Sequence, residues 1–154
     1  MKNSHFIIYF IIFILSCQRS DYNEYHKIKS ILLDINMEGG IEIDEFKYWI
    51  ILPSQGCSSC IHQTLNFFLE NQEKSKDMLL TVTMNSDIKV LNYQLGIDYK
   101  QFPNIMIDLQ NRLSLQGIGS IYPEIFITTE SSVFKRVKIR PENSNELYKI
   151  LNQE

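Results

Sequence analysis

The chain has 154 residues, enough for one globular domain and too few for two of ordinary size. Its apolar content of 44% and charged content of 21% are those of a folded protein and argue against general disorder. The net charge of −3 argues against a nucleic-acid partner, because binding to phosphates needs a basic surface. The chain is therefore expected to be one folded domain whose function depends on local motifs.

The N-terminus has the pattern of an export signal. Lys2 supplies a positive charge, and Phe6 to Leu15 form an uninterrupted apolar run. This run is shorter than the roughly 20 residues that cross a bilayer. With Ile14-Leu15-Ser16-Cys17 it resembles a bacterial lipoprotein signal peptide, in which a small residue precedes the cysteine that receives lipid. Ile14 stands where Leu is commonest. An uncleaved anchor, or a secretory signal with a chance cysteine, is the alternative.

This resemblance implies that residues 1–16 are removed and that Cys17 carries the lipid. The protein would then lie in the bacterial cell envelope, anchored to a membrane and facing the periplasm or the exterior. The chain has three cysteines, an odd number for an exported protein. Lipidation of Cys17 leaves one pair, Cys57 and Cys60, in a compartment where dithiols tend to be oxidised.

Residues 17–40 are expected to form the lipidated N-terminus, followed by a tether or by a first helix. Tyr22, Tyr25 and Ile28 are at loosely helical spacing, which leaves both alternatives open. Gly39-Gly40 predicts a hairpin, or a helix stop followed by a strand at Ile41–Ile43. We place the main domain at residues 41–154.

The most informative stretch runs from Phe46 to Leu69. Phe46 to Leu52 is rich in β-branched and aromatic residues and predicts a buried strand, which Pro53, Ser54 and Gly56 end. A helix follows, with one apolar stripe made by Ile61, Leu65, Phe68 and Leu69. Cys57 and Cys60 thus lie at a helix N-terminus, where free backbone N–H groups and the helix dipole favour a thiolate. A second sulfur within one turn can attack a mixed disulfide formed by the first.

The rest of the chain alternates between predicted strands and helices. Strands are predicted at 78–84, 104–109, 124–128 and 133–139, the last two joined by a polar turn and therefore antiparallel. Helices are predicted from 85–87 to Gly96 and after Pro141, where Asn143 and Glu146 have the spacing of a capping box. Together these elements predict an α/β fold with a mixed central sheet flanked by helices.

This order, with Cys57-Ser-Ser-Cys60 and with Tyr122-Pro123 before a strand, resembles the thioredoxin fold. Phe102–Asp108 and Gly117–Ile127 look closer to the TlpA/ResA-like thiol-disulfide oxidoreductases of the thioredoxin/peroxiredoxin superfamily. The resemblance implies that Cys57 is the exposed nucleophile and Cys60 the shielded resolving thiol. It further implies that a cis peptide bond precedes Pro123, and that the backbone of Tyr122 pairs with an extended substrate.

The sequence also departs from the pattern of that family. Gly56 replaces the usual Trp before the first cysteine, and Ser59 replaces the usual Pro before the second. The dipeptide Ser58-Ser59 therefore leaves open whether the protein is a reductant, an oxidant or an isomerase. A buried acidic proton acceptor is not assignable, and the candidates are Asp44, Glu45 and Asp108.

Several other functions compete with redox exchange. A zinc site needs four ligands, and two cysteines with His26 and His62 have unsuitable spacing, so no metal is predicted. A structural disulfide across so short a loop would stabilise little, and inert thiols are the other alternative. Ser54 lies three residues before Cys57, as in peroxiredoxins, but no matching arginine is evident. His62 is read as a solvated residue rather than a modulator of Cys57.

The basic residues of the last strand are read as a solvated face or a protected sheet edge, and only secondarily as a patch for anionic lipid. They are Lys135, Arg136, Lys138 and Arg140.

The sequence therefore predicts a membrane-anchored extracytoplasmic thiol-disulfide oxidoreductase that needs no cofactor. Its expected partners are protein dithiol or disulfide substrates, or an electron-donating redox protein, with no role for nucleic acid. The alternative from another class is a non-enzymatic thioredoxin-fold lipoprotein, an adaptor or binding module of the cell envelope. A peroxiredoxin-like peroxidase is the third hypothesis.

Overall fold

The computed structural model describes residues 22–36, 40–71, 75–83, 89, 92–93, 98–119, 121–129 and 132–151. The predicted signal peptide with Cys17 lies outside these residues, as does most of the helix predicted to end at Gly96. Within the described part of the chain, no helix has both the length and the apolar character needed to cross a membrane.

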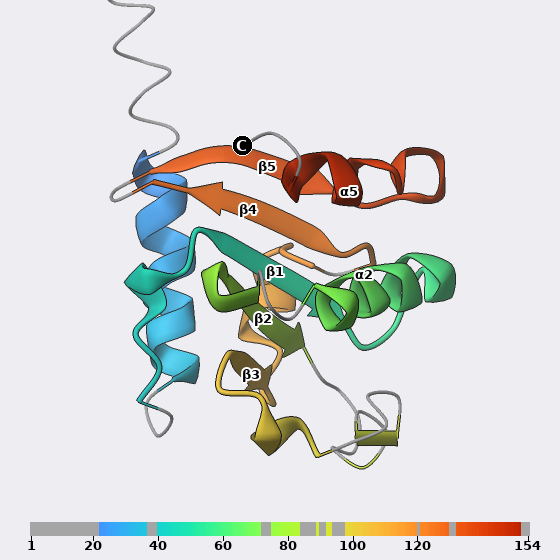
Figure 1. Ribbon diagram of the computed structural model, residues 1–154. Helices are drawn as coiled ribbons and strands as arrows, with labels where there is room; N and C mark the ends of the chain where they lie inside the picture. The colour runs from blue at the N-terminus through green and yellow to red at the C-terminus, as the bar shows by residue number, and fades with distance from the viewer. Residues whose placement is uncertain are drawn as a thin grey trace, which may run out of the picture.

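A five-stranded mixed sheet forms the centre of the molecule, with the order β3-β2-β1-β4-β5 (Figure 1). Strands β1 and β2 are parallel, as are β2 and β3, whereas β4 runs antiparallel to both β1 and β5. The strands are β1 (Tyr48–Pro53), β2 (Met78–Thr83), β3 (Ile105–Asp108), β4 (Glu124–Thr128) and β5 (Val133–Lys138). The predicted mixed sheet with its terminal hairpin is confirmed.

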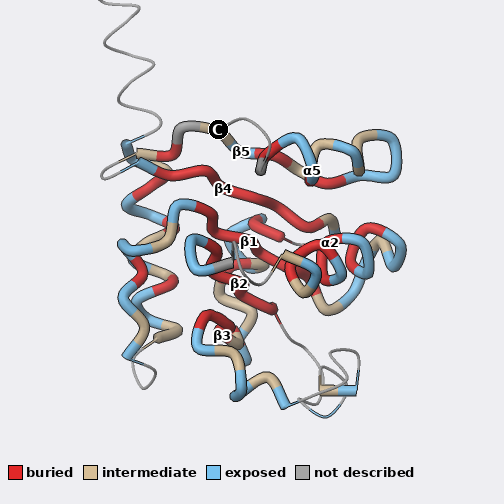
Figure 2. The backbone as a smooth tube through the Cα atoms, viewed as in Figure 1, coloured by how far each residue is buried: buried red, intermediate tan, exposed pale blue. Residues whose placement is uncertain are grey.

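Strand β1 lies in the middle of the sheet and is buried along its whole length (Figure 2). Its side chains alternate between two cores. Tyr48, Ile50 and Leu52 face one side of the sheet, and Trp49 and Ile51 face the other. Burial on both faces explains why the sequence shows a continuous apolar run here rather than an alternating one.

Helices α2 (Ser58–Glu70) and α5 (Glu146–Leu151) cover the first face. The predicted stripe of α2 is buried at Ile61, Leu65 and Phe68 and half-buried at Leu69. The α2 crossover is what allows β1 and β2 to be parallel, because such a pair cannot be joined by a tight turn. A short loop therefore connects the end of β1 to the start of α2.

The predicted capping box before the last helix is wrong in detail. A 3₁₀ turn, η4 (Pro141–Asn143), precedes α5. The Asn143 side chain accepts a hydrogen bond from the Arg140 amide at 2.6 Å and donates one to the Lys138 carbonyl at 2.9 Å. Glu146 instead pairs with Lys149 at 2.9 Å. Asn143 therefore takes part in a capping box with Arg140 at the start of η4, and it fixes the chain reversal after β5.

A helix over residues 22–35 covers the second face of the sheet. Of the two alternatives for this segment, the structure has the helix: Tyr25, Ile28 and Leu32 are buried, and Tyr25 stacks on Trp49 with ring centroids 5.2 Å apart. The strand predicted at Ile41–Ile43 is wrong. A 3₁₀ helix, η1 (Ile43–Glu45), forms there because Ile43 turns into the core.

Asp44 in η1 holds the N-terminal helix through two hydrogen bonds, from Lys29 Nζ at 2.6 Å and from the Tyr25 hydroxyl at 3.0 Å. The hydrogen bond from Lys29 lowers the pKa of Asp44 below its usual 3.8, although partial burial opposes this. A carboxyl group with a lowered folded-state pKa stabilises the fold above the unfolded value, and this contribution is lost as the pH falls through the folded value.

We therefore expect Asp44→Asn to destabilise the protein at pH 7 and to have a smaller effect at pH 2.5, because protonation of Asp44 removes its contribution at low pH. Because Asp44 is 62% exposed, the loss at pH 7 should be about 1 kcal/mol or less. Urea unfolding of both proteins at the two pH values measures this loss, and Asp34→Asn, at an exposed position of the N-terminal helix, is the control. If the free energy of unfolding differed between wild type and Asp44→Asn by the same amount at both pH values, the role assigned to this carboxylate would be contradicted.

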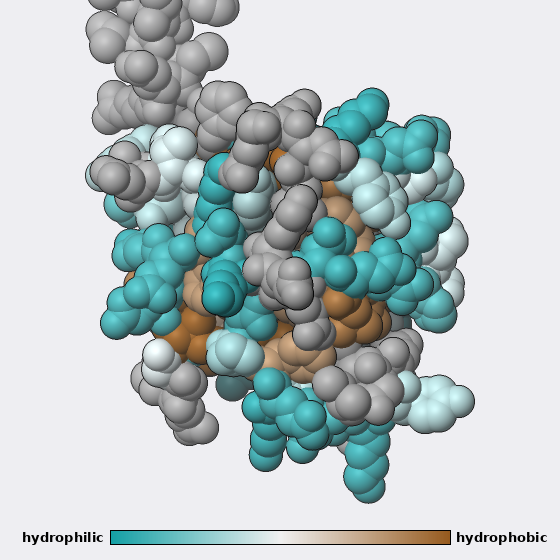
Figure 3. All heavy atoms as spheres, in the orientation of Figure 1, coloured by the Kyte–Doolittle hydropathy of each residue, from teal (hydrophilic) through white to brown (hydrophobic). Residues whose placement is uncertain are grey.

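Two hollows lie beside β3, at one edge of the sheet. The first has a volume of about 320 Å³, and its lining includes Asp34, Asp108 and Arg112. The second has a volume of about 630 Å³, and its lining includes Ile41 and Phe102. Figure 3 shows apolar surface between hydrophilic segments in the middle and lower part of the molecule. Neither of these two hollows is lined by a cysteine, so both are separate from the predicted redox pair.

Candidate redox site

The cysteine pair lies at the N-terminus of α2, just after the loop that connects β1 to this helix. Cys57 is the N-cap residue of α2, with extended backbone angles, and Cys60 lies in the first turn of the helix. The two form a disulfide with their Cα atoms 5.3 Å apart. The hydrogen bond from the Ser54 amide to the Thr83 carbonyl, at 3.0 Å, holds the preceding loop against the end of β2. The predicted strand-to-helix position of both cysteines is confirmed.

The two sulfur atoms have unequal access to solvent. Cys57 is half-buried, whereas Cys60 is 0% exposed and packs among the apolar residues between α2 and the sheet. A disulfide or thiol of another protein can approach Cys57 but not Cys60. This asymmetry is what a nucleophile and a shielded resolving thiol require.

Two donors from the first turn of α2 approach the sulfur of Cys57. The backbone amide of Cys60 donates a hydrogen bond to Cys57 Sγ at 3.4 Å, as an N-cap interaction. The hydroxyl oxygen of Ser59 lies 3.4 Å from the same sulfur. Both groups, and the positive end of the helix dipole, favour negative charge on this sulfur once the disulfide is reduced. His62 is exposed on α2 and has no contact with the pair.

The backbone conformation at residue 56 explains why a glycine stands where tryptophan is usual before the first cysteine of this motif. Gly56 has φ +135°, which L-residues with side chains rarely adopt. A Cβ atom at this position would collide with the backbone of Ile121, its carbonyl oxygen first of all. The loop before Cys57 can therefore lie against the segment at Ile121 only if residue 56 has no side chain.

That close approach is fixed by a hydrogen bond from the Cys57 amide to the Ile121 carbonyl at 3.0 Å. The cysteine loop is thus joined to the segment that leads into β4. Tyr122 packs at the margin of the same core as Cys57. Among the described residues, no backbone group of Tyr122 has a hydrogen-bond partner, so its amide and carbonyl remain available beside the cysteine loop.

The cis bond implied for Pro123 is wrong. The described residues contain no cis peptide bond, so Tyr122–Pro123 is trans, the lower-energy form of an X–Pro bond. Pro123 itself is buried, and its carbonyl accepts a hydrogen bond from the Ile139 amide at 2.8 Å. The structure does bring the Tyr122–Pro123 segment to the cysteines, through Ile121 rather than through the proline.

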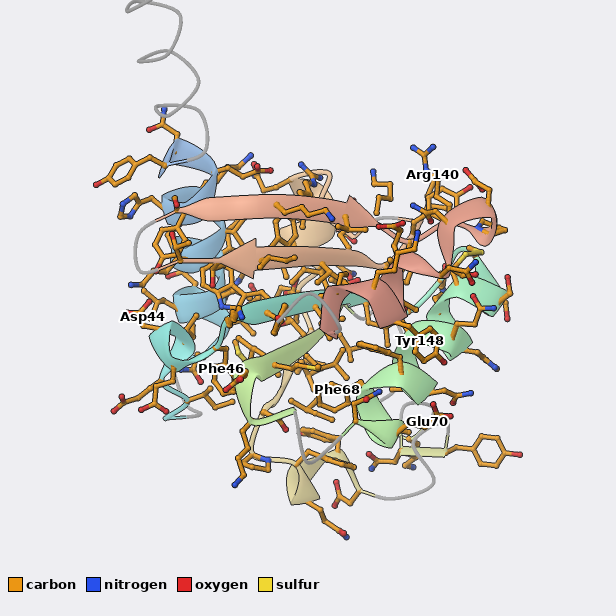
Figure 4. All side chains as sticks on the ribbon, turned by 45° about the horizontal axis from the view of Figure 1, so that its top comes forward. Asp44, Phe46, Phe68, Glu70, Arg140 and Tyr148 are labelled. Carbon is orange, nitrogen blue, oxygen red and sulfur yellow. A yellow bond between two sulfur atoms is a disulfide. The ribbon has the colours of Figure 1, made fainter. Side chains whose placement is uncertain are left out.

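Arg140 adds a positive charge beside this segment. Its guanidinium carbon lies 5.8 Å from the centre of the Tyr122 ring, within cation–π distance, and an Nη atom lies 3.7 Å from Glu142. Figure 4 shows Arg140 at the end of the domain opposite Asp44. The cysteine end of the molecule therefore carries an exposed cation, while the other end holds the N-terminal helix.

Sequence reasoning missed Glu124, the residue after Pro123. Its carboxylate is 1% exposed and pairs with Arg136 at 2.6 Å, and Lys138 Nζ lies 3.1 Å away as an ion contact without hydrogen-bond geometry. Arg136 also pairs with Glu24 of the N-terminal helix at 2.8 Å. The basic residues of β5 are therefore not simply a solvated face, because two of them neutralise a buried charge.

Among the described residues, none of the three candidate proton acceptors forms a hydrogen bond with a cysteine. Asp44 binds the N-terminal helix, and Glu45 is exposed. Asp108 is buried at the end of β3 and accepts a hydrogen bond from the Leu113 amide at 2.9 Å, which caps the short helix α4 (Arg112–Leu115). In the part of the chain that the structure describes, no cluster of three or more metal-binding side chains occurs.

Comparisons with known proteins give similarity at the level of structure. No family model and no curated protein matches the chain. A Chlorobium tepidum protein described as a thiol:disulfide interchange protein DsbE is 20% identical, with a TM-score of 0.48, over 68% of this chain and 77% of its own. The bacterioferritin comigratory protein of Xanthomonas campestris, whose structures concern alkyl peroxide reduction, is 10% identical, with a TM-score of 0.44, over 76% and 87%.

At such scores and identities, the fold rests on the strand order described above rather than on these two structures. A parallel β1-α2-β2 unit is extended on one side by β3 and on the other by the antiparallel hairpin of β4 and β5. The predicted fold class is confirmed by this topology: the chain has a thioredoxin-like α/β fold, with a Cys-x-x-Cys disulfide at the start of α2.

Proposed function

We propose that this protein is a thiol-disulfide oxidoreductase that acts through Cys57 and Cys60. One observation carries the proposal: the disulfide at the N-terminus of α2 joins one half-buried cysteine to one fully buried cysteine. A bridge that only stabilised the fold would need neither the helix N-terminus nor an accessible sulfur. The short loop that it closes would also constrain little of the unfolded chain.

In the reducing direction, the thiolate of Cys57 attacks a disulfide of the partner protein. The partner's S–S bond breaks, a mixed disulfide forms, and one partner sulfur leaves as a thiolate that takes up a proton. Cys60 then loses its proton and attacks Cys57 Sγ, which releases the second partner sulfur. The partner gains two electrons and two protons, and Cys57–Cys60 becomes the disulfide. The same steps run in reverse when the protein acts as an oxidant.

Substrate binding is assigned to the segment beside the cysteines. The backbone groups of Tyr122, which bond to no other described residue, can pair with an extended stretch of a partner protein, and Pro123 fixes the direction of the chain there. The protein would be held in the cell envelope by lipid on Cys17, facing the periplasm or the exterior. Its partners would be protein dithiols or disulfides, or a redox protein that supplies electrons, and the exchange itself needs no cofactor.

The reduction potential of Cys57–Cys60 tests this function. We expect a value between about −270 mV, as in thioredoxin, and about −120 mV, as in a strong periplasmic oxidant. Equilibration in graded thiol buffers, followed by counting of the free thiols at these two cysteines by mass spectrometry, measures the potential and indicates the direction of exchange. A value well below roughly −300 mV would contradict the proposal, because structural disulfides have such potentials.

That second outcome would favour a non-enzymatic binding module. The departures at Gly56 and Ser59 motivate this candidate, because they replace the residues usual in the redox motif. It predicts that Cys57→Ser lowers thermal stability and leaves partner binding intact, whereas the oxidoreductase loses its covalent chemistry.

A further inference from the structure

Ser59 occupies the second helical position of α2, and its hydroxyl oxygen lies 3.4 Å from Cys57 Sγ. The sulfur of a disulfide carries no hydrogen, so the hydroxyl is the donor in this contact. The side chain is exposed, which leaves it free to turn with the sulfur when the disulfide opens. Ser58, its neighbour in the motif, is also exposed, but the hydrogen bonds to Cys57 Sγ come from Ser59 and Cys60 and not from Ser58.

We propose that Ser59 is a positioning residue for the redox reaction, whose hydroxyl donates a hydrogen bond to the Cys57 thiolate in the reduced protein. A hydrogen bond made to the charged form favours that form, and bonds to ionised acceptors are about twice as strong as neutral ones. The amide of Cys60 already donates to the same sulfur at 3.4 Å, so the hydroxyl gives the thiolate a second donor. This inference rests on the proposed exchange function and deepens it.

The proposal gives a role to a residue that otherwise only marks a departure from the family. A proline at position 59 would supply no hydroxyl group. By stabilising the thiolate, Ser59 favours the reduced pair over the disulfide and so shifts the protein toward the oxidising end of the exchange range. It also increases the share of Cys57 that is nucleophilic at neutral pH.

The Ser59→Ala substitution changes none of the titratable or charged groups on the elements around Cys57. These groups are Cys60 and the exposed His62 on α2, Tyr122 on the adjoining segment, and Arg140 with Glu142, which follow β5 and adjoin Tyr122. Glu124 belongs to the opposite face of the sheet, because its neighbour Ile125 packs into the core beneath α2. A difference between Ser59→Ala and Ser58→Ala therefore reports the hydroxyl rather than the surrounding charges.

The test is the pH dependence of the alkylation of Cys57 by iodoacetamide. The full chain is reduced beforehand, and the modified peptide is quantified by mass spectrometry so that other thiols do not contribute. For Ser59→Ala we expect the pH of half-maximal rate to rise by about 0.5 to 1, and the rate at pH 6 to fall roughly threefold to tenfold. Ser58→Ala should behave as wild type, and Ser59→Thr should restore most of the rate.

Equal profiles for Ser59→Ala and wild type would overturn the inference, as would an equal change in Ser58→Ala. Alkylation needs no partner protein, so the result stands whether or not the protein exchanges disulfides. Exchange activity with an unchanged profile for Ser59→Ala would remove only the role of Ser59, whereas a potential below the exchange range would remove the function itself.

Discussion

Replacement of Cys60 by Ser is expected to turn the protein into a covalent trap that holds its partners through Cys57. The wild-type mixed disulfide is short-lived because Cys60 lies next to Cys57 and attacks it. Serine fills nearly the same space without a comparable nucleophile, so the adduct can resolve only by uncatalysed rearrangement, which takes minutes to hours. Acid-quenched cells that express Cys60→Ser should show adducts on non-reducing gels, and a reducing agent should release them for identification.

Cys57→Ser is the matched control. It leaves only Cys60, which is 0% exposed, so few adducts should form. Turnover of a model disulfide should fall in this variant on the order of 10³-fold or more, the scale seen when an enzyme loses its nucleophile. Equal trapping by both variants, or none by Cys60→Ser in cells supplied with reductant, would argue strongly against Cys57 as the nucleophile.

Gly56→Ala is expected to lower the free energy of unfolding by roughly 2–4 kcal/mol. The methyl group would have to occupy the space of the Ile121 carbonyl, at a φ of +135° that alanine does not readily adopt. The loop must then move, and the hydrogen bond from the Cys57 amide to Ile121 is lost with it. Denaturant unfolding of the oxidised protein measures the loss.

Gly117→Ala is the control for this substitution. Gly117 also has a positive φ, +76°, but a Cβ atom there would meet nothing within 4 Å. It should therefore lose only the conformational contribution, about 1–2 kcal/mol. If Gly56→Ala and Gly117→Ala cost the same, the contact between the cysteine loop and Ile121 contributes nothing to stability.

The sheet was predictable from the sequence because its strands carry local signals. The apolar run before Pro53 indicated β1, and the polar turn between the last two strands indicated the antiparallel hairpin. The segment at Ile41–Ile43 was wrongly predicted to be a strand, because an apolar-polar-apolar triplet has the alternation of a strand. Its conformation is decided by contacts with the N-terminal helix, made by Asp44 and Ile43, which no local pattern contains.

The candidate site was predictable in its cysteines and not in its surroundings. Spacing and position identified Cys57 and Cys60, but Ile121 makes its contact with Cys57 through a backbone carbonyl, which leaves no trace in the side-chain pattern. Glu124 was overlooked because a carboxylate within a strand is usually exposed. The available signal was its register: Glu124 pairs directly with Lys138, and Arg136 lies two residues away on the same face.

The N-terminal helix lies beside the start of β1, at the opposite end of that strand from α2 (Figure 1), and Cys57 is the N-cap residue of α2. A lipid on Cys17 would hold the domain by the end where the N-terminal helix begins. The reactive sulfur would then point away from the bilayer, separated from the anchored end by at least the length of β1, roughly 20 Å. A domain anchored in this way would present Cys57 to soluble partners rather than to thiols at the lipid surface.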